Sequence, residues 1–257
     1  MKSKTVLITG STSGLGLAIA IEFAKAGYNI VFNGLEKDGP EIAATVAREN
    51  NVSTFYSPAD MLKPSEIEAM VKEGKSKFGG IDVLINNAGI QYVSPIEDFP
   101  AEKWNDIIGV NLTAAFHTSK AVWQTMKEKK FGRIINISSA HGLTASEYKA
   151  AYVASKHGLI GLTKVLALEG AVVGITANAI CPGYVKTPLV EKQIAEQAKS
   201  HHIPEEEVIR KIMLVKHPVK EFVSAASIGA LALFLASETA SMITGASIPI
   251  DGGWTAQ

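Results

Sequence analysis

Residues 5–16 decide the fold of this chain, and they read Thr5-Val6-Leu7-Ile8-Thr9-Gly10-Ser11-Thr12-Ser13-Gly14-Leu15-Gly16. The apolar run at its start predicts a buried strand, and a helical pattern begins at Gly16. The glycines between them, spaced G-x3-G-x-G, allow a sharp turn and a close approach of the backbone to a pyrophosphate. The following helix would present free N–H groups and its positive dipole end to that anion. The stretch therefore predicts a phosphate-binding loop, with a purely structural turn as the alternative.

Short apolar strands and longer helical patterns alternate along the rest of the chain. Further strands are predicted at 29–32, 83–85, 133–137, 175–180 and 248–250, and helices at 16–26, 41–49, 65–77, 100–129, 151–172 and 225–236. Strands that are apolar throughout are typical of a parallel sheet covered on both faces. Because crossovers between parallel strands are right-handed, we expect a doubly wound, Rossmann-type α/β fold. Without a repeat or linker to divide it, the chain is predicted to be a single domain over 1–257.

The segment 187–223 breaks this alternation. It is helical in pattern but rich in charge and histidine, and it is longer than an ordinary crossover between two strands. We expect it to form a helical lid over a site. The alternative is an insertion without a functional role.

Composition narrows the class of partner. The chain has 257 residues with 25 basic and 25 acidic side chains, so its formal charge is zero and neither a nucleic-acid nor a membrane partner is indicated. Apolar stretches are too short for a signal peptide or a membrane span, and we expect a cytoplasmic protein. The one cysteine, Cys181, is interpreted as a buried packing residue. We expect no metal site.

Two further motifs add chemistry to this framework. Asn86-Asn87-Ala88-Gly89 follows a predicted strand, where ligands bind in open α/β sheets, although an Asn-rich turn held by its own side chains would look the same. Tyr152 and Lys156 are four residues apart in a helical pattern and share one face. A lysine ammonium close to a phenol favours the phenolate, so we expect Lys156 to lower the pKa of Tyr152 and make it an acid–base group. Ser138 and Ser139 end a strand and could orient a carbonyl oxygen.

In order and spacing, these motifs resemble the short-chain dehydrogenases/reductases, together with Asn111, Cys181-Pro182-Gly183 and Asp251-Gly252-Gly253. The resemblance spans the chain and implies a catalytic tetrad of Asn111, Ser139, Tyr152 and Lys156. Ser139 would hold the substrate oxygen, Tyr152 would transfer the proton, Lys156 would bind the nicotinamide ribose, and Asn111 would anchor a water of the proton relay. Cofactor contacts are implied at Gly10, Thr12, Ser13, Gly14, Leu15, Gly16, Gly34, Leu35, Asp60, Met61, Asn87, Ala88, Gly89, Tyr152, Lys156, Pro182, Gly183, Val185 and Thr187.

Residues at the end of the second strand indicate whether the cofactor is NAD or NADP. In Phe32-Asn33-Gly34-Leu35-Glu36-Lys37, Gly34 occupies the place of the carboxylate expected in an NAD enzyme. No arginine stands there to hold a 2′-phosphate, and the phosphate loop between Gly10 and Gly16 has no basic residue. We therefore expect NAD, and Asp60-Met61 is placed like the family's adenine-contacting pair.

Residues beside the tetrad suggest the substrate. Gln91, His141 and Lys149 could surround a small carboxylate, although each has an ordinary structural interpretation as a loop, turn or helix-start residue. Jointly they resemble the branch of the family that acts on small 3-hydroxy acids. That resemblance implies that Gln91, His141, Lys149 and Gln193 bind the carboxylate, with Gln193 arriving from the lid, and that Trp254 encloses the methyl end. Directly after Cys181-Pro182-Gly183 this branch would have tryptophan, and this chain has Tyr184 instead.

This resemblance implies reversible, NAD-dependent oxidation of (R)-3-hydroxybutyrate to acetoacetate by a homotetramer. One alternative is an NADPH-dependent reductase of 3-oxoacyl thioesters. Such a substrate has no free carboxylate and would leave Lys149 and His141 without a partner. A second alternative is a non-catalytic, cofactor-sensing protein on the same fold, which would have no need of the Tyr152–Lys156 pair.

Overall fold

Parallel strands with apolar side chains on both faces form the centre of the molecule. The computed structural model describes residues 3–186, 190–191, 194–195, 198–199 and 202–256. These residues form a seven-stranded parallel sheet in the order β3-β2-β1-β4-β5-β6-β7. The strands are β1 (Thr5–Ile8), β2 (Asn29–Asn33), β3 (Thr54–Ser57), β4 (Val83–Asn86), β5 (Gly132–Ile137), β6 (Ile175–Pro182) and β7 (Ser247–Ile250). The chain order reverses between β1 and β4, which is where ligands bind in a doubly wound sheet.

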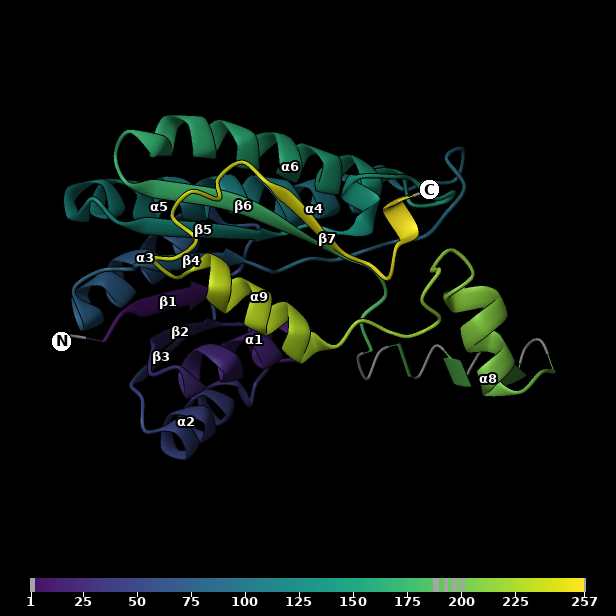
Figure 1. The fold of residues 1–257 in the computed structure, drawn as a ribbon, viewed down its shortest axis with the longest axis horizontal. Coiled ribbons are helices and arrows are strands. Elements are labelled where there is room, and N and C mark those ends of the chain that lie inside the picture. The colour runs from purple at the N-terminus through teal and green to yellow at the C-terminus, as the bar shows by residue number, and fades with distance from the viewer. Residues whose placement is uncertain (1–2, 187–189, 192–193, 196–197, 200–201, 257) are drawn as a thin grey trace.

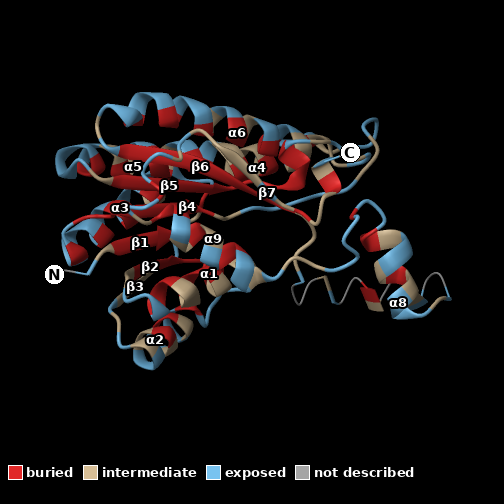
Figure 2. Cartoon of the chain, in the orientation of Figure 1, coloured by how far each residue is buried: buried red, intermediate tan, exposed pale blue. Residues whose placement is uncertain are grey.

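Helices cover both faces of this sheet (Figure 1). They are α1 (Gly14–Lys25), α2 (Gly39–Asn50), α3 (Pro64–Phe78), α4 (Ala101–Ile108), α5 (Ala114–Lys129), α6 (Ala150–Ala171), α8 (Glu205–Val208) and α9 (Ala225–Leu235). Successive side chains of a strand point to opposite faces. Accordingly, Val6 and Ile8 join the core with α1, α2 and α9, while Leu7 joins the core with α3, α5 and α6. The buried sheet between the two helical layers is visible in Figure 2.

The fold confirms the predicted single-domain, doubly wound architecture, and one helix differs from its prediction. The pattern over 100–129 forms α4 and α5 with a π-helical turn, Gly109–Thr113, between them. π-Helical turns are rare and often mark functional sites. This turn contains Asn111, and that side chain binds backbone atoms of a distant loop, as described below.

The predicted lid segment begins and ends at one point of the structure. Val185 and Val223 form a parallel bridge, and Val223 N–H donates to Tyr184 O at 2.8 Å. Between them, α8 leads into a π-helical turn, Ile209–Met213, and Val208, Met213 and Leu214 form a small apolar cluster. In Figure 1, α8 lies on the side toward which the strands point. None of the described helices is long and apolar enough to cross a bilayer.

Candidate active site

The phosphate loop has the close backbone approach that its glycines predict. Gly10 and Gly14 adopt left-handed backbone conformations, with φ of +60° and +52°. A Cβ on Gly16 would lie 2.0 Å from Gly10 O, so no other residue fits there without moving the backbone. α1 begins at Gly14, and the N–H groups of its first turn have no carbonyl of a preceding turn to bind. The loop and helix start together form a cradle that suits a pyrophosphate.

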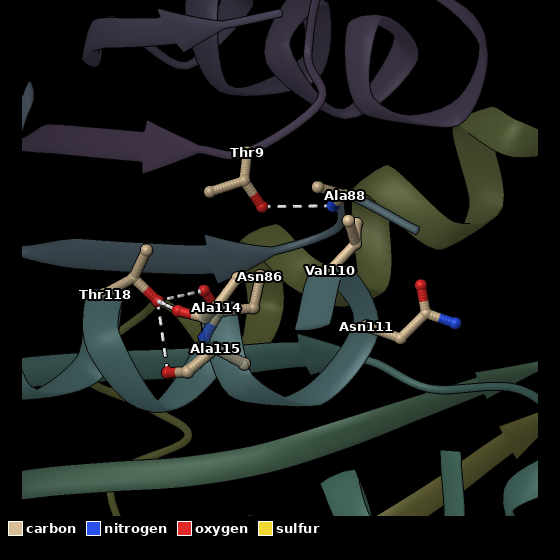
Figure 3. Close-up of a pocket in the computed structure, with 8 residues that line it drawn as sticks. All are labelled: Thr9, Asn86, Ala88, Val110, Asn111, Ala114, Ala115 and Thr118. Atoms are coloured by element: carbon tan, nitrogen blue, oxygen red, sulfur yellow. Dashed lines mark hydrogen bonds between the residues drawn. The ribbon is translucent and has the colours of Figure 1, made fainter. Parts of the chain in front are cut away.

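The Asn86–Gly89 turn holds this loop in place. Thr9 Oγ1 accepts hydrogen bonds from Asn87 N–H and Ala88 N–H, both at 3.0 Å, and Figure 3 shows the second of these. Asn87 Nδ2 donates to Thr9 O and Gly10 O, both at 2.9 Å. The turn is therefore held by its own side chains, as the alternative interpretation proposed. It also faces the catalytic groups, because a Cβ on Gly89 would lie 3.6 Å from Lys156 Nζ.

Glu36 is a residue of the cofactor site that our sequence interpretation missed. Its carboxylate accepts hydrogen bonds from the hydroxyls of Thr12 and Ser13, the latter at 2.8 Å. A Cβ on Gly34 would overlap the Thr12 hydroxyl, so the glycine makes room for this arrangement. Gly34 does not leave the strand end without a carboxylate, because Glu36, two residues later, supplies one. Partial burial would raise the pKa of Glu36, but the two hydroxyl hydrogen bonds outweigh burial and hold it below its usual value.

Asn33 was also missed, and it joins the phosphate loop to the neighbouring strands. This buried amide accepts from Gly10 N–H through Oδ1 at 3.1 Å and donates through Nδ2 to Ala59 O at 2.9 Å. Leu35, which follows, is 69% exposed and open to a bound adenosine. An asparagine that follows apolar strand residues and precedes Gly34 is a sequence signal that could have predicted this link.

The remaining predicted cofactor residues lie at the carboxyl ends of the strands. Asp60 Oδ1 accepts from Leu62 N–H at 2.9 Å, while the Met61 side chain is buried in the core. Gly183 N–H donates to Ile250 O at 3.0 Å and so ties the turn after Pro182 to β7. Thr187, a predicted cofactor contact, and Gln193, a predicted substrate contact, lie outside the described residues.

Cys181 precedes this turn and has no part in the site chemistry. The side chain is fully buried, and burial raises the pKa of its thiol to about 11. A thiol that stays protonated at neutral pH is a poor nucleophile. The predicted packing role is therefore confirmed.

Asn111 is held rigidly by the π-helical turn. Its side chain accepts from Ile90 N–H at 2.8 Å and donates to Ile90 O at 3.0 Å and to Ser155 Oγ at 3.1 Å. Asn111 also lines a small pocket with Thr9, Asn86 and Thr118 (Figure 3). The amide thus fastens the loop after Gly89 to the helix that carries Tyr152 and Lys156.

Lys156 is buried beside Tyr152, the predicted acid–base residue. Its Nζ donates to Ile137 O at 2.8 Å and lies 5.6 Å from the centre of the Tyr152 ring. Burial lowers the pKa of Lys156 to about 8. Ser138 donates to Lys156 O at 3.1 Å, which leaves Ser139 as the serine at the site.

The predicted lowering of the Tyr152 pKa is wrong for this structure. Burial raises the pKa of Tyr152, and a hydrogen bond with Ser139 offsets only part of that rise. The buried phenolate loses more hydration than its neighbours replace. Tyr152 is therefore a neutral phenol at pH 7, which is the form that donates a proton.

The predicted substrate residues gather around an aromatic wall. His141 and Trp254 are buried, and their rings meet edge to face at 4.9 Å. His141 also lies edge to face with Tyr152 at 5.9 Å, and Lys149 Nζ lies 5.7 Å from the centre of the Tyr184 ring. Gln91 is exposed, and no hydrogen bond among the described residues joins it to this group. The structure thus brings His141, Lys149 and Trp254 together with Tyr152, but not Gln91.

Electrostatics in this pocket are positive. Burial, together with the charges of Lys149 and Lys216, lowers the pKa of His141 to about 4. Burial also lowers the pKa of Lys149, with a second contribution from Lys216. An anion bound between Lys149 and Lys216 would relieve the repulsion between these two cations. The cluster of His141, Lys149 and Lys216 near Tyr152 therefore suits a carboxylate.

Tyr184 occupies the position where tryptophan was expected, and it completes the wall. Its ring stacks on Trp254 at 5.8 Å with an interplanar angle of 6°, and the buried His217 lies 5.4 Å from Trp254. His217 also fills the space beside Gly183, where a Cβ would meet its ring at 2.5 Å. These contacts connect the last part of the predicted lid with the turn after β6 and with the pocket wall.

Comparisons with known proteins agree with this geometry. Residues 4–198 match the short chain dehydrogenase family. The chain is 54% identical to a D-beta-hydroxybutyrate dehydrogenase of Rhizobium meliloti over 99% of this chain and 100% of that protein. It is 51% identical to a D-beta-hydroxybutyrate dehydrogenase of Cupriavidus necator over the full length of both. A solved structure of an actinorhodin polyketide ketoreductase with NADPH superposes with a TM-score of 0.92 at 32% identity, covering 99% of this chain and 98% of that chain. The chain therefore belongs to the short-chain dehydrogenase family of oxidoreductases, whose members use a nicotinamide cofactor.

Proposed function

We propose that this protein catalyses the reversible, NAD-dependent oxidation of (R)-3-hydroxybutyrate to acetoacetate. The observation that carries the proposal is that His141 lies edge to face with Tyr152 and that Lys149 is close enough to lower the pKa of His141. Lys149 offers a positive charge, and the neutral His141 imidazole offers a hydrogen-bond donor, for a carboxylate close to the acid–base group. The names of the two relatives above, which are similar along the whole chain, support the same substrate.

Each residue of the tetrad has a role that follows from its position. In the reducing direction the neutral Tyr152 phenol donates a proton to the carbonyl oxygen, which Ser139 orients. In the oxidising direction the phenolate removes the hydroxyl proton, and Lys156 favours that form when it is charged. Asn111 holds the loop and helix in register. A bound nicotinamide ring would supply the hydride acceptor or donor.

Glu36 is the observation that favours NAD over NADP. The cradle formed at Gly10, Gly16 and Gly34 leaves backbone room for a dinucleotide, and Glu36 holds a negative charge on the hydroxyls of Thr12 and Ser13. A 2′-phosphate on the adenosine ribose would add further negative charge there. The proposed cofactor is therefore NAD, with Gly10 to Gly16, Leu35 and Lys156 as further contacts.

Three expectations accompany this proposal. The segment 187–223 closes over the substrate as a lid from its base at the Val185–Val223 bridge, and Gln193 and Gln91 reach the carboxylate in the closed form. The protein assembles as a homotetramer. It acts in the cytoplasm on a small-molecule substrate.

The decisive experiment follows the appearance of reduced nicotinamide when purified protein meets NAD and (R)-3-hydroxybutyrate. We expect an (R)-selective signal, with the (S) enantiomer and NADP as parallel controls. A silent assay combined with NADPH-dependent reduction of an acetoacetyl thioester would replace the proposed substrate and cofactor with those of a thioester reductase. Lys149→Ala distinguishes the dehydrogenase from the thioester reductase in a second way. The variant should impair turnover of 3-hydroxybutyrate, whose carboxylate loses its partner, but not reduction of a thioester, which has no carboxylate.

A further inference from the structure

Lys216 belongs to the predicted lid segment and contacts Ser146 and Trp254, and none of the motifs above includes it. Its Nζ donates to Ser146 Oγ at 3.2 Å, and the same Ser146 oxygen lies 2.9 Å from His141 Nε2. Ser146 therefore links Lys216 to His141, whose ring lies against Tyr152. The connection joins residues 70 positions apart in the sequence.

Lys216 and Lys149 each approach one ring of the aromatic wall formed by Tyr184 and Trp254. Lys216 Nζ lies 5.8 Å from the centre of the Trp254 ring, and Lys149 Nζ lies 5.7 Å from the centre of the Tyr184 ring. Because Tyr184 and Trp254 stack on each other, the two ammonium groups approach neighbouring rings of one wall. Lys216 is exposed and reaches the pocket from the solvent side, whereas Lys149 is partly buried.

The described charged groups that act on His141 and Lys149 are basic. The charged groups that act on His141 are Lys149, Lys216 and His157, and the charged group that acts on Lys149 is Lys216. No carboxylate of the described residues is among them. Two ammonium groups that repel each other across a pocket bind an anion more strongly than either does alone, because the anion also removes their repulsion.

We propose that Lys216 is a second cation for the substrate carboxylate, which it binds together with Lys149. The inference rests on the proposed function and identifies a specificity residue of that site. Lys216 makes the pocket select a free carboxylate over an ester or thioester of the same length.

The test compares a charged substrate with a neutral one of the same skeleton. In Lys216→Met we expect the KM for (R)-3-hydroxybutyrate to rise by about tenfold, the worth of one charge-assisted hydrogen bond. The KM for its methyl ester should stay within about twofold, and Lys216→Arg should recover most of the loss. Lys211→Met, which removes an exposed lysine paired with Glu207 on the same segment, is the matched control and should change neither KM.

A purely structural role for Lys216 would raise the KM of acid and ester together, and that result would overturn the proposal. An unchanged KM for the acid would overturn it as well. Calorimetric binding of acetoacetate and of methyl acetoacetate to the protein with NADH separates this inference from the proposed function. Weaker binding of acetoacetate alone to Lys216→Met, in a protein that does not oxidise 3-hydroxybutyrate, would keep the second cation and remove the proposed reaction.

Discussion

The Glu36 carboxylate accepts a hydrogen bond from the Ser13 hydroxyl at 2.8 Å, across the 23 residues that separate the phosphate loop from the end of β2. The same carboxylate binds the Thr12 hydroxyl. Its negative charge is thus fixed on the loop that we expect to hold the pyrophosphate. We expect this charge to disfavour a cofactor with an additional phosphate.

Glu36→Gln keeps the shape of the side chain and removes its charge. We expect the ratio of kcat/KM with NAD to kcat/KM with NADP to fall by about tenfold, because repulsion of the 2′-phosphate is lost. Steady-state kinetics with both cofactors measure this ratio. Glu41→Gln, an exposed glutamate in the first turn of α2, is the control and should leave it unchanged. The same ratio in wild type and Glu36→Gln would remove Glu36 as the discriminating group.

Gly16→Ala tests the backbone cradle. The added methyl group would lie 2.0 Å from Gly10 O, so the loop must move, and we expect the dissociation constant for NAD to rise by at least about tenfold. Gly161→Ala on α6 is the matched control, because its Cβ would meet no atom within 4 Å. Fluorescence titration with NADH measures both variants. Equal affinity for the two would show that the loop tolerates the methyl group.

Tyr152→Phe removes the hydroxyl and keeps the ring against His141. We expect turnover to fall by roughly 10²- to 10⁴-fold while NADH still binds, since only the proton transfer is lost. In the wild type, burial raises the pKa of Tyr152, so the phenolate is scarce at neutral pH and oxidation should accelerate as the pH rises. Reduction needs the neutral phenol and should not show that rise. Undiminished activity in Tyr152→Phe would contradict the mechanism.

His141 predicts an effect of pH on stability. Its pKa is about 4 in the folded protein and about 6.5 in the unfolded chain, so the unfolded chain binds an additional proton between these values. The free energy of unfolding should therefore fall as the pH drops from 6.5 toward 4, by up to about 3 kcal/mol from this residue. Urea unfolding at several pH values measures it. His141→Asn should show a smaller loss over the same range, and an identical loss would assign the effect to other groups.

Apolar runs such as Ile134 to Ile137 predict their strands because a parallel sheet buries both faces of every strand. Tyr152 and Lys156 could likewise be placed from their four-residue spacing. Glu36 could not, because its contact with Ser13 depends on how the chain turns after Gly34. The position of Lys216 could not be predicted for a similar reason, because its contact with Ser146 depends on the path of the segment 187–223.

The π-helical turn at Gly109–Thr113 has a consequence for how this part of the chain tolerates change. A helix turns by about 100° per residue, and a π-helical turn accommodates one residue more than an α-helical turn. One helical wheel drawn through 101–129 would therefore place the faces of α4 and α5 out of phase. Deleting one residue within the turn would restore a continuous α-helix and remove the widened turn that carries Asn111. Asn111 would then lose its bonds to Ile90, so a deletion that leaves the helix intact would still loosen the active-site loop.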